Sequence, residues 1–122
     1  MNNSLQMDPL ATLLLLIVFD LIWITQIMKP LFEPMIQNIQ GSPLSTNGVK
    51  ALIAYIILFL FAYIFIPKMD NYTDTFLLGF FTYAIYETTN FTVFDKWNPY
   101  VVVLDSLWGG VLLCLLRYFC LH

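Results

Sequence analysis

The sequence predicts an all-α, polytopic membrane protein in which four transmembrane helices form a compact bundle. Hydrophobic residues make up 60% of the 122 residues and charged residues only 11%, whereas a soluble domain has roughly 25% charged residues. The apolar residues are gathered in four runs, each long enough to cross a bilayer as a helix. Prolines and polar turns separate these runs. We therefore expect a single membrane domain, residues 1–122, in an integral, multi-pass protein.

The first apolar run extends from Leu10 to Lys29 and is opened by Pro9. We expect it to end at Lys29-Pro30, because proline lacks a backbone donor and its ring clashes with the preceding helical turn. No Lys or Arg precedes the run, so it does not resemble a cleaved signal peptide and is expected to remain as a spanning helix. Asp20 lies near the middle of this run, where a carboxylate is energetically unfavourable.

The next two segments are predicted to be a loop and a scaffold helix. Residues 30–47 contain two prolines, a glycine and several polar residues, which leaves too few apolar residues to cross a bilayer. We expect an interfacial loop there, with room for a short helix through Phe32, Met35 and Ile36. The second run, Lys50 to Pro67, has no acidic or basic residue between its ends and is expected to be the scaffold helix.

The third run, Thr75 to Thr92, combines a polar stripe with an apolar surface. At helical spacing, Gly79, Tyr83, Glu87 and Asn90 share one stripe. The residues largely off this stripe are apolar: Phe80, Phe81, Ile85 and Phe91. A charge inside hydrocarbon costs at least ~2.5 kcal/mol, so Glu87 is expected to face other protein groups or water. The stripe should therefore point inward and the aromatic side chains outward.

The fourth run, Tyr100 to Phe119, follows a turn that carries Trp97, which is expected at the membrane interface. It contains Asp105 and the pair Gly109-Gly110. Adjacent glycines allow a partner helix or a ligand to approach the backbone closely. An even number of spans also places both termini on the same side of the membrane.

The three buried acids, Asp20, Glu87 and Asp105, are expected to lie at a similar depth. The first and third runs are parallel and the fourth runs back, so all three carboxyls should fall in the half of the membrane nearer Lys29 and Trp97. The five basic residues map to helix ends and turns. In a low dielectric three carboxylates cannot all stay ionised, because desolvation and mutual repulsion oppose it. They should share protons, bind a cation or open to water, and titrate as one cluster.

An Asp-x-x-Trp pattern occurs twice, as Asp20-Leu-Ile-Trp23 and as Asp105-Ser-Leu-Trp108. Residues three apart lie on one face of a helix, so each indole is expected to cover the acid of its own helix and to donate a hydrogen bond nearby. Four residues are too few to indicate duplication, and we interpret the repeat as local convergence.

A structural interpretation of the polar side chains must be weighed against a functional one. Interhelical hydrogen bonds, worth ~0.6 kcal/mol each, would by themselves account for the polar residues of the third run. These are Tyr83, Tyr86, Thr88, Thr89 and Asn90. Tryptophans likewise serve more often in packing or at the interface than in ligand contacts. Three acids on three of four helices are harder to explain in this way, and they favour a functional cluster.

Three segments carry a resemblance to a known family. They are Val-Phe-Asp-Leu-Ile-Trp in the first run, Gly-Phe-Phe-Thr-Tyr-Ala-Ile-Tyr-Glu-Thr-Thr-Asn in the third and Val-Leu-Asp-Ser-Leu-Trp-Gly-Gly in the fourth. Over almost the whole chain the sequence resembles the small four-helix membrane proteins of domain-of-unknown-function family 2177, found in bacteria and in some large DNA viruses. The third-span acid of that family is often Asp, so Glu87 departs from it by one methylene. The resemblance implies the fold and ten marked positions, but no activity: Asp20, Trp23, Tyr83, Tyr86, Glu87, Thr89, Asn90, Asp105, Trp108 and Gly109.

The leading functional hypothesis is a small proton- or cation-handling membrane protein, either a transporter or channel-like. In it, Asp20, Glu87 and Asp105 exchange protons or coordinate a cation. Two alternatives stay open: an intramembrane enzyme that uses two carboxyls as general acid and base on a lipid or isoprenoid substrate, and a structural or assembly protein of a membrane. Expected partners are membrane lipids, a second copy of the chain in a homodimer, and a small cation or lipid-like ligand. We expect no cofactor, and the absence of a basic patch argues against nucleic acid.

Overall fold

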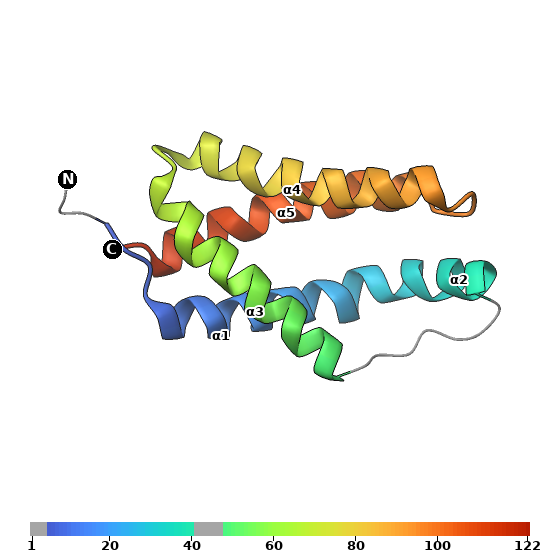
Figure 1. Cartoon of the computed structure of the whole chain (residues 1–122), viewed down its shortest axis with the longest axis horizontal. Coiled ribbons are helices and arrows are strands. Elements are labelled where there is room, and N and C mark those ends of the chain that lie inside the picture. Colours follow the sequence, from blue (N-terminus) through green and yellow to red (C-terminus); the bar gives the residue numbers. More distant parts are fainter. Residues whose placement is uncertain (1–4, 41–47) are drawn as a thin grey trace.

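The computed structural model describes residues 5–40 and 48–122, and its secondary structure is helical apart from one isolated bridge between Met7 and Leu121 (Figure 1). In chain order the elements are α1 (Pro9–Ile22), the π-helical segment η1 (Trp23–Met28), α2 (Lys29–Gln40), α3 (Gly48–Phe65), the 3₁₀ turn η2 (Ile66–Lys68), α4 (Tyr72–Val93) and α5 (Pro99–Cys120). The predicted all-α bundle is confirmed.

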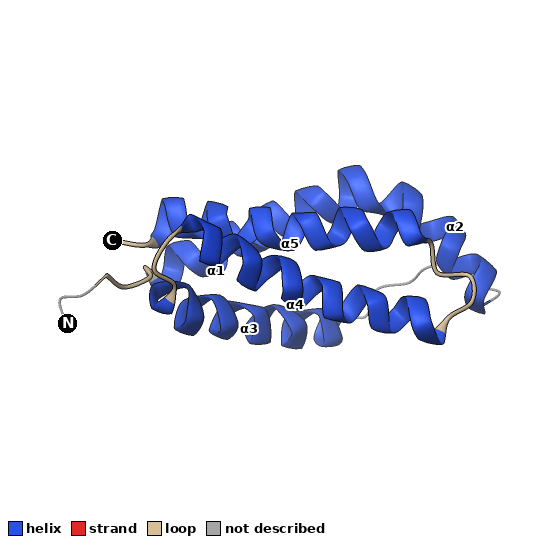
Figure 2. Cartoon of the chain, turned by 90° about the horizontal axis from the view of Figure 1, so that it is seen from above, coloured by secondary structure: helices blue, strands red, loops and turns tan. Residues whose placement is uncertain are grey.

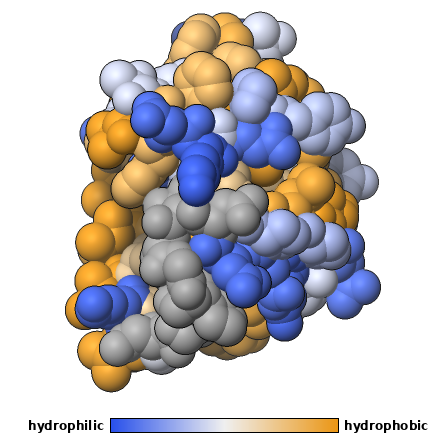
Figure 3. Space-filling view, turned by 90° about the vertical axis from the view of Figure 1, so that its right-hand side faces the viewer, coloured by the Kyte–Doolittle hydropathy of each residue, from blue (hydrophilic) through white to orange (hydrophobic). Residues whose placement is uncertain are grey.

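Three stretches of the described chain are long and apolar enough to cross a membrane: Pro9–Gln37, Gly48–Lys68 and Pro99–Cys120. At 22 residues α4 has the length of a span, but its acid and several threonines make it less apolar than the others. At the end of the bundle formed by α2 and the α4–α5 turn, hydrophilic side chains gather beside hydrophobic flanks (Figure 3). Together with its apolar helices, this distribution identifies an integral, multi-pass membrane protein.

The prediction that the first helix ends at Lys29-Pro30 was wrong. The chain stays helical from α1 through η1 into α2, and the Lys29 N–H donates to the carbonyl of Ile24, five residues back. Such a π turn shifts the hydrogen-bond register by one residue, which lets a helix pass a proline that has no N–H of its own. Of the predicted interfacial loop, residues 30–40 are therefore part of a helix, while residues 41–47 lie outside the described chain.

The other three helices begin and end within three residues of the predicted spans. Local capping explains several of these boundaries. The side chains of Asp8, Asn71 and Asn98 accept hydrogen bonds from backbone N–H groups at the starts of α1, α4 and α5, at 3.1, 2.8 and 2.8 Å. Prolines occupy the first turns of α1 and α5, where the missing N–H has no intrahelical partner to lose.

Helices α4 and α5 lie side by side along their length (Figures 1 and 2). Gly79 of α4 and Gly109 of α5 form a close backbone contact: a Cβ added to either residue would overlap the carbonyl oxygen of the other. Gly110 lies against the ring of Phe76 in the same way. The expectation that these glycines admit a partner helix is confirmed, and the close approach holds the inner face of α4 against α5.

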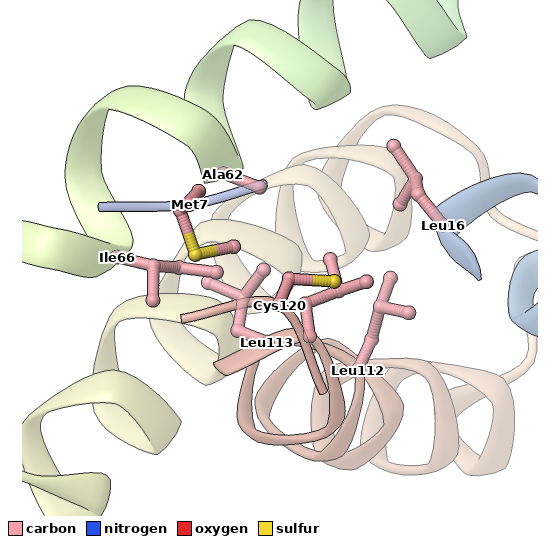
Figure 4. Packing of buried hydrophobic residues seen from close by; sticks show 8 residues of the cluster. Met7, Leu16, Ala62, Ile66, Leu112, Leu113 and Cys120 are labelled. Atoms are coloured by element: carbon pink, nitrogen blue, oxygen red, sulfur yellow. The ribbon is translucent and has the colours of Figure 1, made fainter. Parts of the chain in front are cut away.

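The apolar core lies at the end of the bundle where the two termini meet (Figure 4). Its residues come from the N-terminal segment, α1, α3, η2 and α5: Met7, Leu16, Ala62, Ile66, Leu112, Leu113, Leu116 and Cys120. The two ends of the chain are joined by backbone hydrogen bonds between Gln6 and His122, at 2.9 and 3.1 Å, and between Asp8 and Cys120, at 2.9 Å. The first described residues and the C-terminus therefore lie at one end of the bundle, as the topology predicted.

Arg117 connects α5 to the turn between α3 and α4. Its Nη1 donates to the carbonyls of Ile66 and Met69 at 3.4 and 3.0 Å, and to the Thr75 hydroxyl at 3.1 Å. We expect Arg117→Met to lower the free energy of unfolding in detergent by about 1–3 kcal/mol, because these acceptors lose a charged donor. Thermal unfolding followed by circular dichroism measures this. Lys68→Met, at an exposed position of the same turn, is the control; equal effects of the two changes would contradict the prediction.

Candidate functional site

The structure brings the three intramembrane acids together inside the bundle. Asp20 of α1 is 8% exposed, Glu87 of α4 is fully buried and Asp105 of α5 is 8% exposed. Asp105 lies close enough to interact electrostatically with both Asp20 and Glu87. The carboxyls of three helices, far apart in the sequence, thus form one group, which we call the carboxyl cluster.

Glu87 has one oxygen with a partner and one without. Its Oε1 accepts a hydrogen bond of 2.9 Å from the indole N–H of Trp97, which is itself 7% exposed in the α4–α5 turn. Its Oε2 is buried and receives no hydrogen bond of regular geometry from the described residues, although the Asp105 carboxyl is its neighbour. A proton on Oε2 would supply the missing donor, directed at the carboxyl of Asp105.

The two Asp-x-x-Trp motifs exchange their hydrogen bonds. Trp23 donates to Asp105 Oδ1 at 3.2 Å, and Trp108 donates to Asp20 Oδ1 at 3.3 Å. The two indoles stack with centroids 4.8 Å apart and planes 3° from parallel. The prediction that each indole covers the acid of its own helix was wrong. Because the helices are antiparallel, the acid of one motif faces the tryptophan of the other, so each indole bonds across the contact rather than along its own helix.

Two hydrogen-bond donors to the carboxyl cluster were missed from the sequence. The Tyr55 hydroxyl of α3 donates to Asp20 Oδ2 at 2.8 Å, so the predicted scaffold helix also supplies a polar group. A signal existed in the sequence. The second and fourth runs start on the same side of the membrane, and Tyr55 and Asp105 each follow the start of their run, Lys50 or Tyr100, by five residues, so the two side chains lie at equal depth. For Trp97 the sequence indicated a position near the interface but not its burial or its hydrogen bond to Glu87, described above.

The polar stripe of α4 faces inward as predicted. Gly79 and Glu87 are buried, and Tyr83 and Asn90 are half-buried. Tyr83 packs against Gly109 and lies near the carboxyls of Asp20 and Asp105. The residues off the stripe are more exposed, with Phe81 56%, Ile85 67% and Phe91 47% exposed and Phe80 half-buried.

Two predicted site residues are exposed, unlike the buried carboxyl cluster. Tyr86 is 60% exposed, and the exposed Thr89 hydroxyl donates to the Ile85 carbonyl of its own helix at 2.6 Å. Thr88 does the same with the Ala84 carbonyl at 2.7 Å. The interpretation of these threonines as interhelical hydrogen-bond donors is therefore wrong; they satisfy their hydroxyls within α4 instead.

The partners of the carboxyls define what the cluster can do chemically. Asp20 and Glu87 receive indole and phenol donors and have another carboxyl nearby. Within residues 5–40 and 48–122, no group of three or more acidic, histidine or cysteine side chains has an arrangement suited to a metal ion. N–H and O–H donors fix individual carboxyl oxygens and leave Glu87 Oε2 open, an arrangement suited to exchanging protons.

The stacked tryptophans offer a direct test of the exchanged hydrogen bonds. Trp23→Phe and Trp108→Phe each keep a ring but remove one N–H donor to a carboxyl, and each is expected to lower the free energy of unfolding by about 1–2 kcal/mol. Because both changes act on one stacked pair, the double variant should lose less than the sum. Denaturation in detergent, followed by circular dichroism, measures all three. Tyr100→Phe, at an exposed position, is the control. If the double variant lost the full sum of the two single losses, the two tryptophans would not act as one stacked pair.

These features define a class: a small multi-pass helical membrane protein that encloses a carboxyl cluster between its helices. The profile of the DUF2177 family, described as predicted membrane proteins, matches residues 7–120. The chain therefore belongs to this family, as the resemblance of its three segments indicated. No curated protein and no solved structure matches the chain.

Proposed function

We propose that the protein is a proton-handling membrane transporter in which Asp20, Glu87 and Asp105 exchange protons within the carboxyl cluster. The observation that carries this proposal is the fully buried Glu87. Trp97 donates to its Oε1, Oε2 accepts no hydrogen bond from an N–H or O–H donor of the described residues, and the Asp105 carboxyl interacts with the same side chain. A fixed structural acid would be expected to have partners on both oxygens.

The hydrogen bonds around Glu87 and Asp105 suit a proton that moves between the two groups. When Glu87 holds the proton on Oε2, it can donate to Asp105, and the Asp105 carboxylate keeps the Trp23 N–H. When Asp105 holds the proton, the Glu87 carboxylate keeps the Trp97 N–H. Each acid therefore has its own indole donor in both states, so the proton can move without rearrangement of the helices.

Asp20 is the third member of the cluster and has a different environment. Its two oxygens accept from Trp108 and Tyr55, so both have donors that stabilise a carboxylate. Two carboxylates about 4 Å apart repel by ~4 kcal/mol at an effective dielectric near 20. Such repulsion disfavours ionisation of all three acids at once, so at least one carboxyl of the cluster should be protonated at pH 7.

Infrared difference spectra and proton flux test the proposal together. Spectra across pH 4 to 9 should contain a protonated carboxyl band that persists near pH 7 and changes in both Glu87→Gln and Asp105→Asn. Vesicles that contain the purified protein should lose an imposed pH gradient faster than empty vesicles. Vesicles that hold the gradient, together with no such band at pH 7, would overturn the proposal. A copurifying lipid would then favour the intramembrane enzyme.

A further inference from the structure

Helices α3 and α4 share the η2 turn at one end and diverge from it (Figure 1). An apolar groove lies between these two helices. Its volume is about 550 Å³, within the range of sites that hold small organic ligands. The walls include Ala54, Ile57 and Phe61 of α3 and Tyr83 and Tyr86 of α4. Because Ala54, Ile57 and Tyr86 are exposed, the groove opens sideways, toward the lipid, rather than toward water.

Asp105 of α5 also lines this groove and is the acidic group among its lining residues. One of its oxygens accepts from Trp23, and its carboxyl interacts with the buried side chain of Glu87. The groove therefore joins an apolar, lipid-facing entrance to the carboxyl cluster. A molecule that enters from the membrane reaches the same acid that the proposed proton exchange uses.

We propose that the groove between α3 and α4 binds a lipophilic organic cation whose charge is held by Asp105. This inference rests on the proposed proton exchange and adds its substrate class: the cation and a proton compete for the carboxyl cluster. Charge complementarity selects this occupant. A neutral acyl chain would fill the apolar walls but offer no positive charge to Asp105, and an anion would be repelled by the cluster.

The aromatic side chains of the groove favour the same class of ligand. Phe61, Tyr83 and Tyr86 lie on its two walls, and the faces of aromatic rings attract cations, most strongly where water is excluded. The position of Asp105 makes proton release on binding an expected consequence. The groups near Asp105 on the packed elements are Asp20 of α1, Trp23 of η1, and Tyr83 and Glu87 of α4. Tyr55 of α3 donates to Asp20.

Tetraphenylphosphonium and tetraphenylborate are suitable probes, because they have nearly the same shape and opposite charges. Binding is measured on the full chain in nanodiscs of zwitterionic lipid, after subtraction of empty discs. The cation is expected to bind saturably at pH 7 and to release protons into weakly buffered solution. The anion should bind at least 10-fold more weakly. Equal saturable binding of both ions would overturn the proposal, because the charge would then have no influence.

Two matched pairs of variants locate the site. Ala54→Trp fills the groove from an exposed position and should weaken cation binding at least 10-fold, whereas Ile53→Trp, exposed on the same helix but outside the groove, should not. Asp105→Asn should have the same effect as Ala54→Trp. Its control, Asp95→Asn, removes an exposed acid in the α4–α5 turn. An unchanged affinity in a folded Ala54→Trp protein would overturn the proposal even where Asp105→Asn does not fold.

The outcome also separates this proposal from the proton exchange on which it rests. If vesicles lose the pH gradient but the phosphonium does not bind, the groove is not a cation site and the proton exchange stands. If the phosphonium binds without releasing protons and the vesicles hold the gradient, the competition with protons is wrong together with the proposed function.

Discussion

Gly79→Ala is expected to lower the free energy of unfolding by about 3 kcal/mol, at the upper end of the effects of overpacking. The added methyl group would overlap the backbone carbonyl of Gly109, which cannot move aside as a flexible side chain can. Helices α4 and α5 would have to separate over the segment that carries Glu87 and Asp105. Denaturation of the purified protein in detergent, followed by circular dichroism, measures the loss.

Gly48→Ala is the matched control for this prediction. Gly48 begins α3, and a Cβ there would meet nothing within 4 Å. Alanine also favours the helical backbone more than glycine does, so this variant should be at least as stable as the parent. If Gly79→Ala were equally harmless, the close backbone contact between α4 and α5 would not contribute to the stability of the bundle.

Glu87→Gln is expected to reduce proton flux at least 10-fold while leaving the free energy of unfolding within about 1 kcal/mol. The amide oxygen can still accept from Trp97, and the amide N–H₂ can donate to Asp105 as a protonated Glu87 would. The shape and the hydrogen bonds are kept, and only the exchangeable proton is lost. Flux into vesicles and denaturation in detergent, measured on the same preparation, separate the two effects.

Glu33→Gln provides the corresponding change outside the cluster. Glu33 lies on α2, about half exposed, 3.5 Å from Lys29, so its substitution should alter neither flux nor stability appreciably. Severe unfolding of Glu87→Gln would instead support the structural interpretation of the acids. Normal flux in that variant would remove Glu87 from the proton pathway.

The fold could be predicted from the sequence because hydrocarbon imposes a simple rule: each crossing needs an uninterrupted helix of apolar residues. The runs from Lys50, Thr75 and Tyr100 became α3, α4 and α5 with small shifts at their ends. The expectation that Pro30 ends the first helix was wrong, because whether a proline ends a helix depends on the hydrogen bonds of the turn before it. There the π-helical segment η1 carries the helix past the proline.

The inward face of α4 also followed from the sequence, since side chains three and four residues apart must share a side of a helix. The same reasoning placed Asp20, Glu87 and Asp105 at one depth. It could not assign their hydrogen bonds. Periodicity describes one helix at a time, whereas a hydrogen bond between helices depends on which neighbour lies opposite and how far it is shifted along its axis.

The sequence alone therefore determined that this is a helical membrane protein with three acids directed into its interior, because the free energy of burial depends on residue type and spacing. Only the tertiary structure decided the partners of those acids. Because the two helices are antiparallel, Trp23 donates to Asp105 and Trp108 donates to Asp20. The α4–α5 turn places Trp97 against Glu87. The tertiary structure also created the groove beside Asp105. The divergence of α3 from α4 depends on how the helices pack, which the sequence of either helix does not show.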